Sequence, residues 1–72
     1  GVTYQGMCKN GNQLVDAKTS GVKDIFDCQD ICKNNNKCKS FEYNYSKNIC
    51  KLFDNKCTNL EKSLDFTTLN RI

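Results

Sequence analysis

The sequence contains no histidine, no proline and no tryptophan, and these absences exclude several features. Without histidine, the chain lacks the side chain that most often serves as a general base or as a nitrogen ligand of zinc. Without proline, its turns depend on Gly and Asn, as at Asn10-Gly11-Asn12. No apolar stretch approaches the ~20 residues of a membrane-spanning helix, and no run of like charge reaches five residues. We therefore expect neither direct membrane insertion nor binding to nucleic acid.

The acidic residues form no catalytic or cofactor motif. Seven of the eight lie at scattered positions from the helix onward, namely Asp24, Asp27, Asp30, Glu42, Asp54, Glu61 and Asp65. The chain has no phosphate-binding loop and no calcium-binding loop. Its cysteines lack the two Cys-x-x-Cys knuckles of a zinc ribbon. The sequence therefore predicts a protein that is not an enzyme and that uses no metal or other cofactor.

Cysteine, by contrast, is abundant, with six residues in a chain of 72. An even number of cysteines in so short a chain is typical of a disulfide framework formed in an oxidising compartment. A core this small usually needs such covalent support. We expect residues 1–72 to form a single secreted or extracellular domain. Because the sequence begins at Gly1 without a leader, we expect a mature protein or an excised piece of a larger ectodomain.

The clearest local pattern is a helix over residues 25–34. Asp24 is a suitable N-cap for it. Four apolar residues recur at helical spacing on one face: Ile25, Cys28, Ile31 and Cys32. The run of asparagines from Asn34 then ends the helix.

Strand patterns lie mainly after this helix. Alternating aromatic residues predict a strand over residues 40–45, and residues 49–53 complete a hairpin after a short polar turn. Weaker patterns cover residues 2–5, 13–15 and 64–69. These elements predict an α+β fold in which one helix packs on a small antiparallel sheet.

The positions of the cysteines on these elements indicate how they pair. Cys28 and Cys32 lie one helical turn apart and project from the same face, so a bond between them is poorly placed. Cys38 follows the helix directly and is the natural partner of Cys32, whereas a strand cysteine, Cys50, would pin the hairpin to Cys28. The two that remain pair by elimination, and they are Cys8 and Cys57.

The middle of the chain reads Cys28-x3-Cys32-x5-Cys38-x-Ser40-Phe41-x-Tyr43-Asn44, followed by Cys50-x-Leu52. This pattern resembles the core of the PAN/apple domain family, in which a C-x3-C helix precedes an aromatic strand and a C-x-Leu strand. The resemblance covers residues 21–52, and we take residues 21–53 as the core. In vertebrate apple domains the sixth cysteine lies far downstream, near the last strand, whereas here Cys57 follows Cys50 by only seven residues.

The resemblance implies an extracellular recognition module that binds protein or carbohydrate. Family members occur in plasma prekallikrein, in plasminogen, in leech antiplatelet proteins and in adhesins of apicomplexan parasites, which are often secreted from micronemes. The composition is rich in Asn and Lys, which fits the parasite branch better than the vertebrate one. We therefore expect secretion through an organelle such as the microneme.

Two sets of residues are candidates for ligand binding. The first is cationic and surrounds the hairpin, at Lys33, Lys37, Lys39, Lys47, Lys51 and Lys56. Lysines gathered on one face would bind a sulfated glycan, whereas scattered lysines would only aid solubility; the small net charge of +3 favours the second interpretation. The other candidate is Phe26, off the apolar stripe of the helix. It is either an exposed hot spot for a protein partner or a residue packed under a loop, and we favour packing.

The alternation along the second strand of the hairpin also predicts which residues face away from the helix. Ile49, Lys51 and Phe53 alternate with Cys50 and Leu52, so they should point away from the helix. The candidates to cover this outer face are the chain termini, a neighbouring domain and a ligand, and we expect it to pack against the termini. Near the hairpin turn, Asn44-Tyr45-Ser46 forms a sequon for N-glycosylation.

The leading hypothesis is an adhesion module within a larger secreted or cell-surface adhesin. Its ligand would be an extracellular protein or a glycan, sulfated glycans included, and we favour protein. Two alternatives come from other functional classes. One is a stand-alone effector such as an inhibitor or toxin, and the other is a structural spacer.

Overall fold

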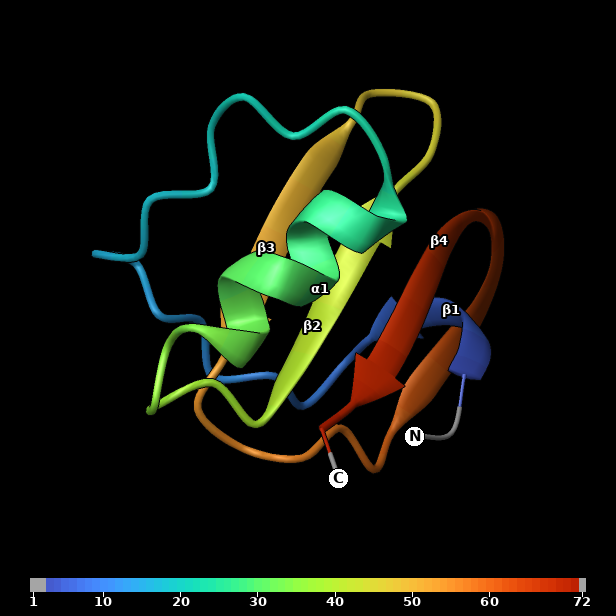
Figure 1. The fold of residues 1–72 in the computed structure, drawn as a ribbon. Coiled ribbons are helices and arrows are strands. Elements are labelled where there is room, and N and C mark those ends of the chain that lie inside the picture. The colour runs from blue at the N-terminus through green and yellow to red at the C-terminus, as the bar shows by residue number, and fades with distance from the viewer. Residues whose placement is uncertain (1–2, 72) are drawn as a thin grey trace.

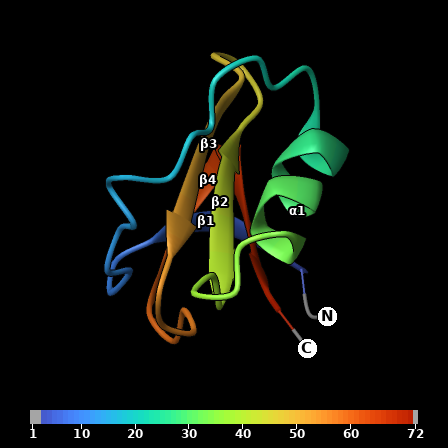
Figure 2. The ribbon, with the colours of Figure 1, turned by 60° about the vertical axis from the view of Figure 1, so that its left-hand side comes forward.

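The computed structural model describes residues 3–71, which form one helix and four strands (Figure 1). In chain order these are β1 (Thr3–Cys8), α1 (Ile25–Lys33), β2 (Ser40–Asn44), β3 (Ile49–Phe53) and β4 (Leu60–Asn70). The strands form one antiparallel sheet in the order β1-β4-β2-β3. The helix covers one face of this sheet, against β2 and β3 (Figure 2). The predicted α+β fold is confirmed.

Polar side chains mark the start of α1. Asp24 has an extended backbone, and its side chain accepts a hydrogen bond of 3.0 Å from the backbone N–H of Asp27. Asp27 in turn accepts one of 2.9 Å from the backbone N–H of Lys23. The first bond satisfies a donor that the first turn of a helix leaves without a partner, and the second ties the residue before the cap to that turn. The helix ends at Lys33, one residue earlier than predicted, with Asn34 as its C-cap.

β2 is one of the two inner strands of the sheet, and all five of its residues are buried. It pairs with β3 in a register that sets Phe41 opposite Leu52 and Tyr43 opposite Cys50. The turn between the two strands contains Asn48, whose φ of 53° lies in the left-handed region that Asn tolerates. The hairpin predicted from the aromatic alternation is therefore present, although Tyr45 lies just beyond β2.

β4 connects the two halves of the sheet, because it pairs with both β1 and β2. Its register with β1 shifts between Gln5 and Gly6, and residues 63–66 of β4 have no partner on β1. The strand curves there, from its orange to its red part in Figure 1. A Cβ atom on Gly6 would come within 2.6 Å of the carbonyl oxygen of Glu61, so the close approach of the two strands requires glycine.

The core lies between α1 and the sheet. Its buried members are Val22, Cys28, Cys32, Cys38, Phe41, Tyr43, Cys50 and Leu52. Four of these eight residues are cysteines, so covalent bonds replace part of the apolar packing that a larger domain would have.

The outer face of the sheet differs from the prediction. Phe53 is only 4% exposed, and the loop that follows β1 covers it rather than the chain termini. A Cβ atom on Gly11 would lie 2.5 Å from the Phe53 ring, so the absence of a side chain lets the loop lie flat on that ring. Ile49 is exposed and Lys51 is partly exposed. The predicted packing against the termini is therefore wrong.

Two of the weaker strand predictions also need correction. The segment over residues 13–15 is not a strand, since Gln13 forms only an isolated bridge with Phe53. The loop contacts the free edge of β3 at this one point and then leaves it, so no ladder of hydrogen bonds develops. The strand expected over residues 2–5 runs instead from Thr3 to Cys8, and Val2 lies outside the described residues. β4 is longer than the expected residues 64–69.

Candidate functional site

Two disulfides hold α1 against the sheet. Cys28 is bonded to Cys50 on β3 and Cys32 to Cys38 before β2, with Cα–Cα distances of 5.6 and 5.3 Å. The third bridge joins Cys8 at the end of β1 to Cys57, with a Cα–Cα distance of 5.9 Å. These are the three pairs that we expected from the sequence. Because two bonds fix the helix, its outward side chains have a defined position before any ligand arrives.

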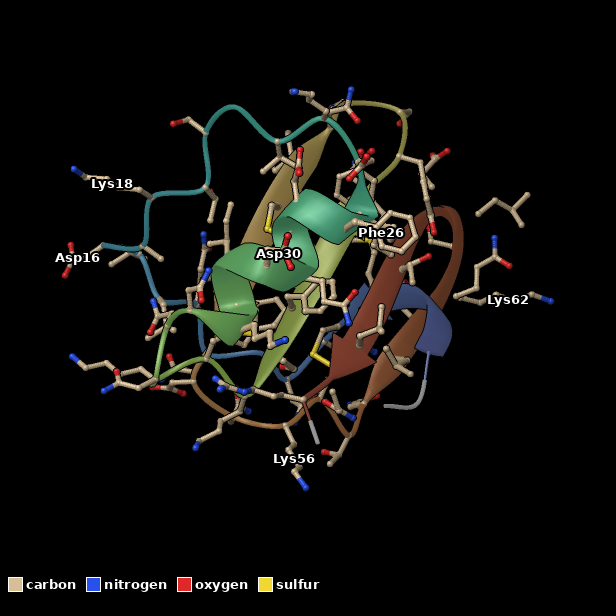
Figure 3. The ribbon with its side chains drawn as sticks, in the orientation of Figure 1. Asp16, Lys18, Phe26, Asp30, Lys56 and Lys62 are labelled. Carbon is tan, nitrogen blue, oxygen red and sulfur yellow. A yellow bond between two sulfur atoms is a disulfide. The ribbon has the colours of Figure 1, made fainter. Side chains whose placement is uncertain are left out.

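Phe26 stands on the outward side of this fixed helix, with 68% of its surface exposed. Figure 3 shows its ring beside the first turn of α1, on the side facing β4. Within the described residues no loop covers it, so the expected packing of Phe26 is wrong: the loop before the helix runs away from β4, past the end of β3 (Figure 1). Gln29 and Lys33 follow at i+3 and i+7 and therefore lie on the same flank of the helix.

A cleft of about 370 Å³ lies between this flank and the end of β4. Gln29 and Lys33 contribute its helical wall, and Arg71 its other end. Two apolar residues form the floor, where Phe41 on β2 pairs with Leu69 on β4. The volume lies within the range of small-ligand sites, which is roughly 300–1,000 Å³. We refer to this space as the α1–β4 cleft.

The guanidinium group of Arg71 is held in place by the backbone. Its Nη1 donates to the carbonyl oxygens of Cys32, Asn35 and Cys38, at 3.3, 3.0 and 3.3 Å. Its backbone N–H also donates to the carbonyl of Lys39 at 2.8 Å. Arg71 is not among the residues predicted from the sequence, since a single arginine near the end of the chain carries no motif and only the fold brings it to the helix.

The structure divides the predicted cationic set between several regions. Lys33 lies in the α1–β4 cleft, and Lys37 and Lys39 lie in and just after the turn that follows α1. Lys56 follows β3 at this same end of the hairpin, because Ser40 pairs with Phe53 (Figure 3). Lys47 and Lys51 lie elsewhere, in the turn between β2 and β3 and on the face of β3 away from the helix, respectively. Lys47 is separated from Lys39 by the length of β2, roughly 15 Å.

Tyr43 lies in the core near the start of α1, and burial raises the pKa of its hydroxyl group. The charge of Asp24, the neighbouring Tyr45 hydroxyl and the charge of Asp27 raise this pKa further. The hydroxyl donates to the Oδ1 of Asn48, and the rings of Tyr43 and Tyr45 meet edge to face with centroids 5.2 Å apart. The phenol is therefore neutral at physiological pH and serves the fold as a hydrogen-bond donor.

A second cleft, of about 400 Å³, lies between two loops rather than beside the helix. Residues 13–17 form one of its sides and residues 35–37 the other. Its charged groups are Asp16 and Lys37, which have opposite signs. Residues 35–37 lie within the short loop that the Cys32–Cys38 disulfide closes, whereas residues 13–17 contain no cysteine, so only one side of this cleft has the support that the disulfides provide to the first one.

Charge pairing and metal binding add no further site in residues 3–71. Within this range no Lys or Arg side chain lies within 4.0 Å of a carboxylate as an ion pair, and no cluster of three or more potential metal ligands occurs. None of the helices in the described part of the chain is long and apolar enough to cross a membrane.

One helix joined by disulfides to a four-stranded antiparallel sheet defines a small disulfide-stabilised α+β domain. A model of the PAN domain matches residues 2–71, and the chain therefore belongs to the PAN domain family. PAN domains are generally adhesion modules that bind proteins or carbohydrates, rather than catalysts. The family and the three disulfides together indicate an extracellular module. No curated protein and no solved structure matches the chain.

Proposed function

We propose that this PAN domain is an adhesion module that recognises a protein partner outside the cell, as one unit of a larger secreted or cell-surface adhesin. The observation that supports this most is the exposure of Phe26 on a helix fixed by two disulfides. Aromatic residues held on rigid elements are typical energetic hot spots of protein interfaces. The apolar floor of the α1–β4 cleft next to it adds a recess that a partner side chain can fill.

The test is binding of the fluorescently labelled, oxidised protein to cultured animal cells. Phe26→Ala should lower the affinity roughly tenfold or more, as loss of an aromatic hot spot does. Val15→Ala is the matched control, because Val15 is an apolar residue that is 79% exposed on the long loop before α1. Brief treatment of the cells with protease should abolish binding, while treatment with heparinase should leave it intact.

A second candidate function is recognition of a sulfated glycan. It is favoured by the cations at one end of the hairpin, where Lys37, Lys39 and Lys56 have no ion-pair partner among the described residues. A glycan array that includes sulfated sugars, probed at physiological salt, discriminates between the two functions. Binding to sulfated glycans alone, lost at higher salt and in Lys37→Gln/Lys39→Gln, would replace the protein hypothesis with this one.

The remaining alternatives give different results in the same experiments. A structural spacer would bind neither cells nor glycans, and Phe26→Ala would change nothing. A stand-alone effector would act as a free monomer by blocking a protease, receptor or channel. Equal cell binding by Phe26→Ala and Val15→Ala would contradict the proposal.

A further inference from the structure

We propose that the α1–β4 cleft binds a peptide carboxylate that adjoins an apolar side chain. This inference rests on the proposed function, because it specifies what part of a protein partner the cleft would hold. The carboxylate would lie between Lys33 and Arg71, and the apolar side chain would lie on Phe41 and Leu69. Three features of the cleft support this assignment: the sign of its charges, the fixed position of Arg71 and the apolar floor.

The charged groups of the cleft have one sign. Lys33 and Arg71 are both cations, Gln29 is neutral, and no carboxylate lines the cleft. The side chain of Lys33 makes no hydrogen bond or ion pair with any described residue. Two cations that face one recess without an internal counterion attract an anion, and the low polarity of the floor strengthens that attraction.

Arg71 presents a fixed edge to this recess. The three carbonyl oxygens that bind Nη1 determine where the guanidinium group lies, whereas Nε and Nη2 have no partner among the described residues. A guanidinium group with a free edge suits the planar geometry of a carboxylate, which it binds through two parallel hydrogen bonds. Since the backbone already restricts the arginine side chain, less entropy is lost when a ligand binds.

The floor distinguishes a peptide from a sulfated sugar. Phe41 and Leu69 offer apolar carbon rather than hydrogen-bonding groups, and Leu69 is only partly buried, so a ligand can still contact it. A sulfated glycan needs mainly exposed cations and gains little from such a floor. A carboxylate joined to an aliphatic side chain contacts the cations and the floor together. A protein presents this combination at its C-terminal end, or where an Asp or Glu lies beside an apolar residue.

The experiment is an amide NMR titration of the isotope-labelled, oxidised protein at physiological salt. N-acetyl-leucine supplies the carboxylate and the apolar group of a chain end, and N-acetyl-leucine amide is the same molecule without the charge. Acetyl-Leu-Asp-amide carries its carboxylate on a side chain, and a sulfated heparin disaccharide tests the other anion. Both acids should shift the amide signals of Lys33, Leu69 and Arg71, while the uncharged amide should not.

Two substitutions in the helical wall test the role of charge. Lys33→Gln should weaken binding of the acids about fivefold, the upper range for one exposed charge pair. Gln29→Glu, made separately, should weaken binding of the acids more than Lys33→Gln does, because it places a negative charge beside the bound carboxylate. Lys56→Gln is the control, since it removes the same charge outside the cleft and should leave binding unchanged. Arg71 is not substituted, because it also holds the turn after α1.

Each result decides for or against the cleft. Absence of shifts with both acids, equal shifts with the uncharged amide, or binding of the disaccharide alone would overturn the inference. The relative affinities of the two acids show whether a chain end or a side chain is preferred. If the acids fail while Phe26→Ala still weakens cell binding, the inference is wrong but the proposed function stands. If the acids bind while Phe26→Ala leaves cell binding intact, the inference stands but the proposed function is wrong.

Discussion

Asn44 is the acceptor residue of the only Asn-x-Ser/Thr sequon in the chain, yet its side chain is 6% exposed. Its Oδ1 accepts hydrogen bonds from the backbone N–H groups of Ser46 and Lys47 and from the Ser46 hydroxyl, at 2.9–3.0 Å. The side-chain amide therefore shapes the turn after β2. Its burial leaves no path by which an attached, bulky glycan could reach solvent. We expect protein secreted from eukaryotic cells to lack a glycan at Asn44, which intact mass spectrometry can measure.

A control sequon shows whether the expression host glycosylates this domain at all. Asn36→Thr creates one at Asn34, which is exposed in the turn after α1. This variant should gain a glycan while Asn44 remains unmodified. A glycan on Asn44 of the folded wild-type protein would contradict the packing described for β2.

Tyr43 links stability to alkaline pH. Its pKa is higher in the folded protein than the unfolded value of about 10, so the folded state holds the phenolic proton more tightly. This contribution to stability is fully present below about pH 10 and is lost as the pH rises through the folded pKa. The unfolding free energy from urea titrations should therefore fall above pH 10, and it should fall less in Tyr43→Phe. Equal declines in the two proteins would refute the role of Tyr43.

At the scale of elements, the start of α1 depends on the cap that Asp24 provides. Asp24→Ala removes the hydrogen bond to the backbone N–H of Asp27 and should lower the unfolding free energy by about 1 kcal/mol. Asp24→Asn keeps a capping oxygen without the charge and should cost much less. Asp30→Ala, which removes an exposed acid from the same helix (Figure 3), should have little effect. Thermal unfolding monitored by circular dichroism gives all three values, and equal destabilisation by the three variants would argue against capping.

The elements that the sequence predicts well are those determined by neighbouring residues. The helix and the β2–β3 hairpin follow from a cap, a 3.6-residue stripe and an aromatic alternation within short segments. β4 was underestimated because its first part, Leu60–Lys62, has no apolar alternation and becomes a strand only through pairing with β1. The prediction for residues 13–15 was too generous, since this segment meets the edge of β3 only at Gln13 and forms no ladder along it.

For the molecule as a whole, the three disulfides dominate stability. They close loops with sequence separations of 6, 22 and 49 residues. The loop-entropy relation assigns them roughly 2, 3 and 4 kcal/mol, and the sum is an upper bound because the loops are nested. Even so, it is comparable to the total stability of a small domain, about 5–15 kcal/mol. We expect reduction to unfold the protein, with loss of its near-ultraviolet circular dichroism. A reduced sample that keeps this spectrum would disprove the expectation.

The candidate site could be predicted only in part. Helical spacing placed Phe26 off the core stripe, but whether a loop would cover it depended on the path of residues 9–24, which no local pattern determines. The six predicted lysines separate into different regions, because strand length and direction, rather than position in the sequence, determine which charges meet. Arg71 reaches the α1–β4 cleft only because β4 ends beside the turn after the helix.

By itself, the sequence determined the helix, the hairpin and the expected pairing of the cysteines, because short-range periodicity and the reach of one disulfide are local constraints. The tertiary structure decided the long curved β4, the burial of Phe53 under Gly11, the exposure of Phe26 and the placement of Lys33 and Arg71 in one cleft. All of these depend on contacts between segments far apart in the chain. Such contacts form only when the whole chain satisfies its backbone hydrogen bonds and buries its apolar surface together.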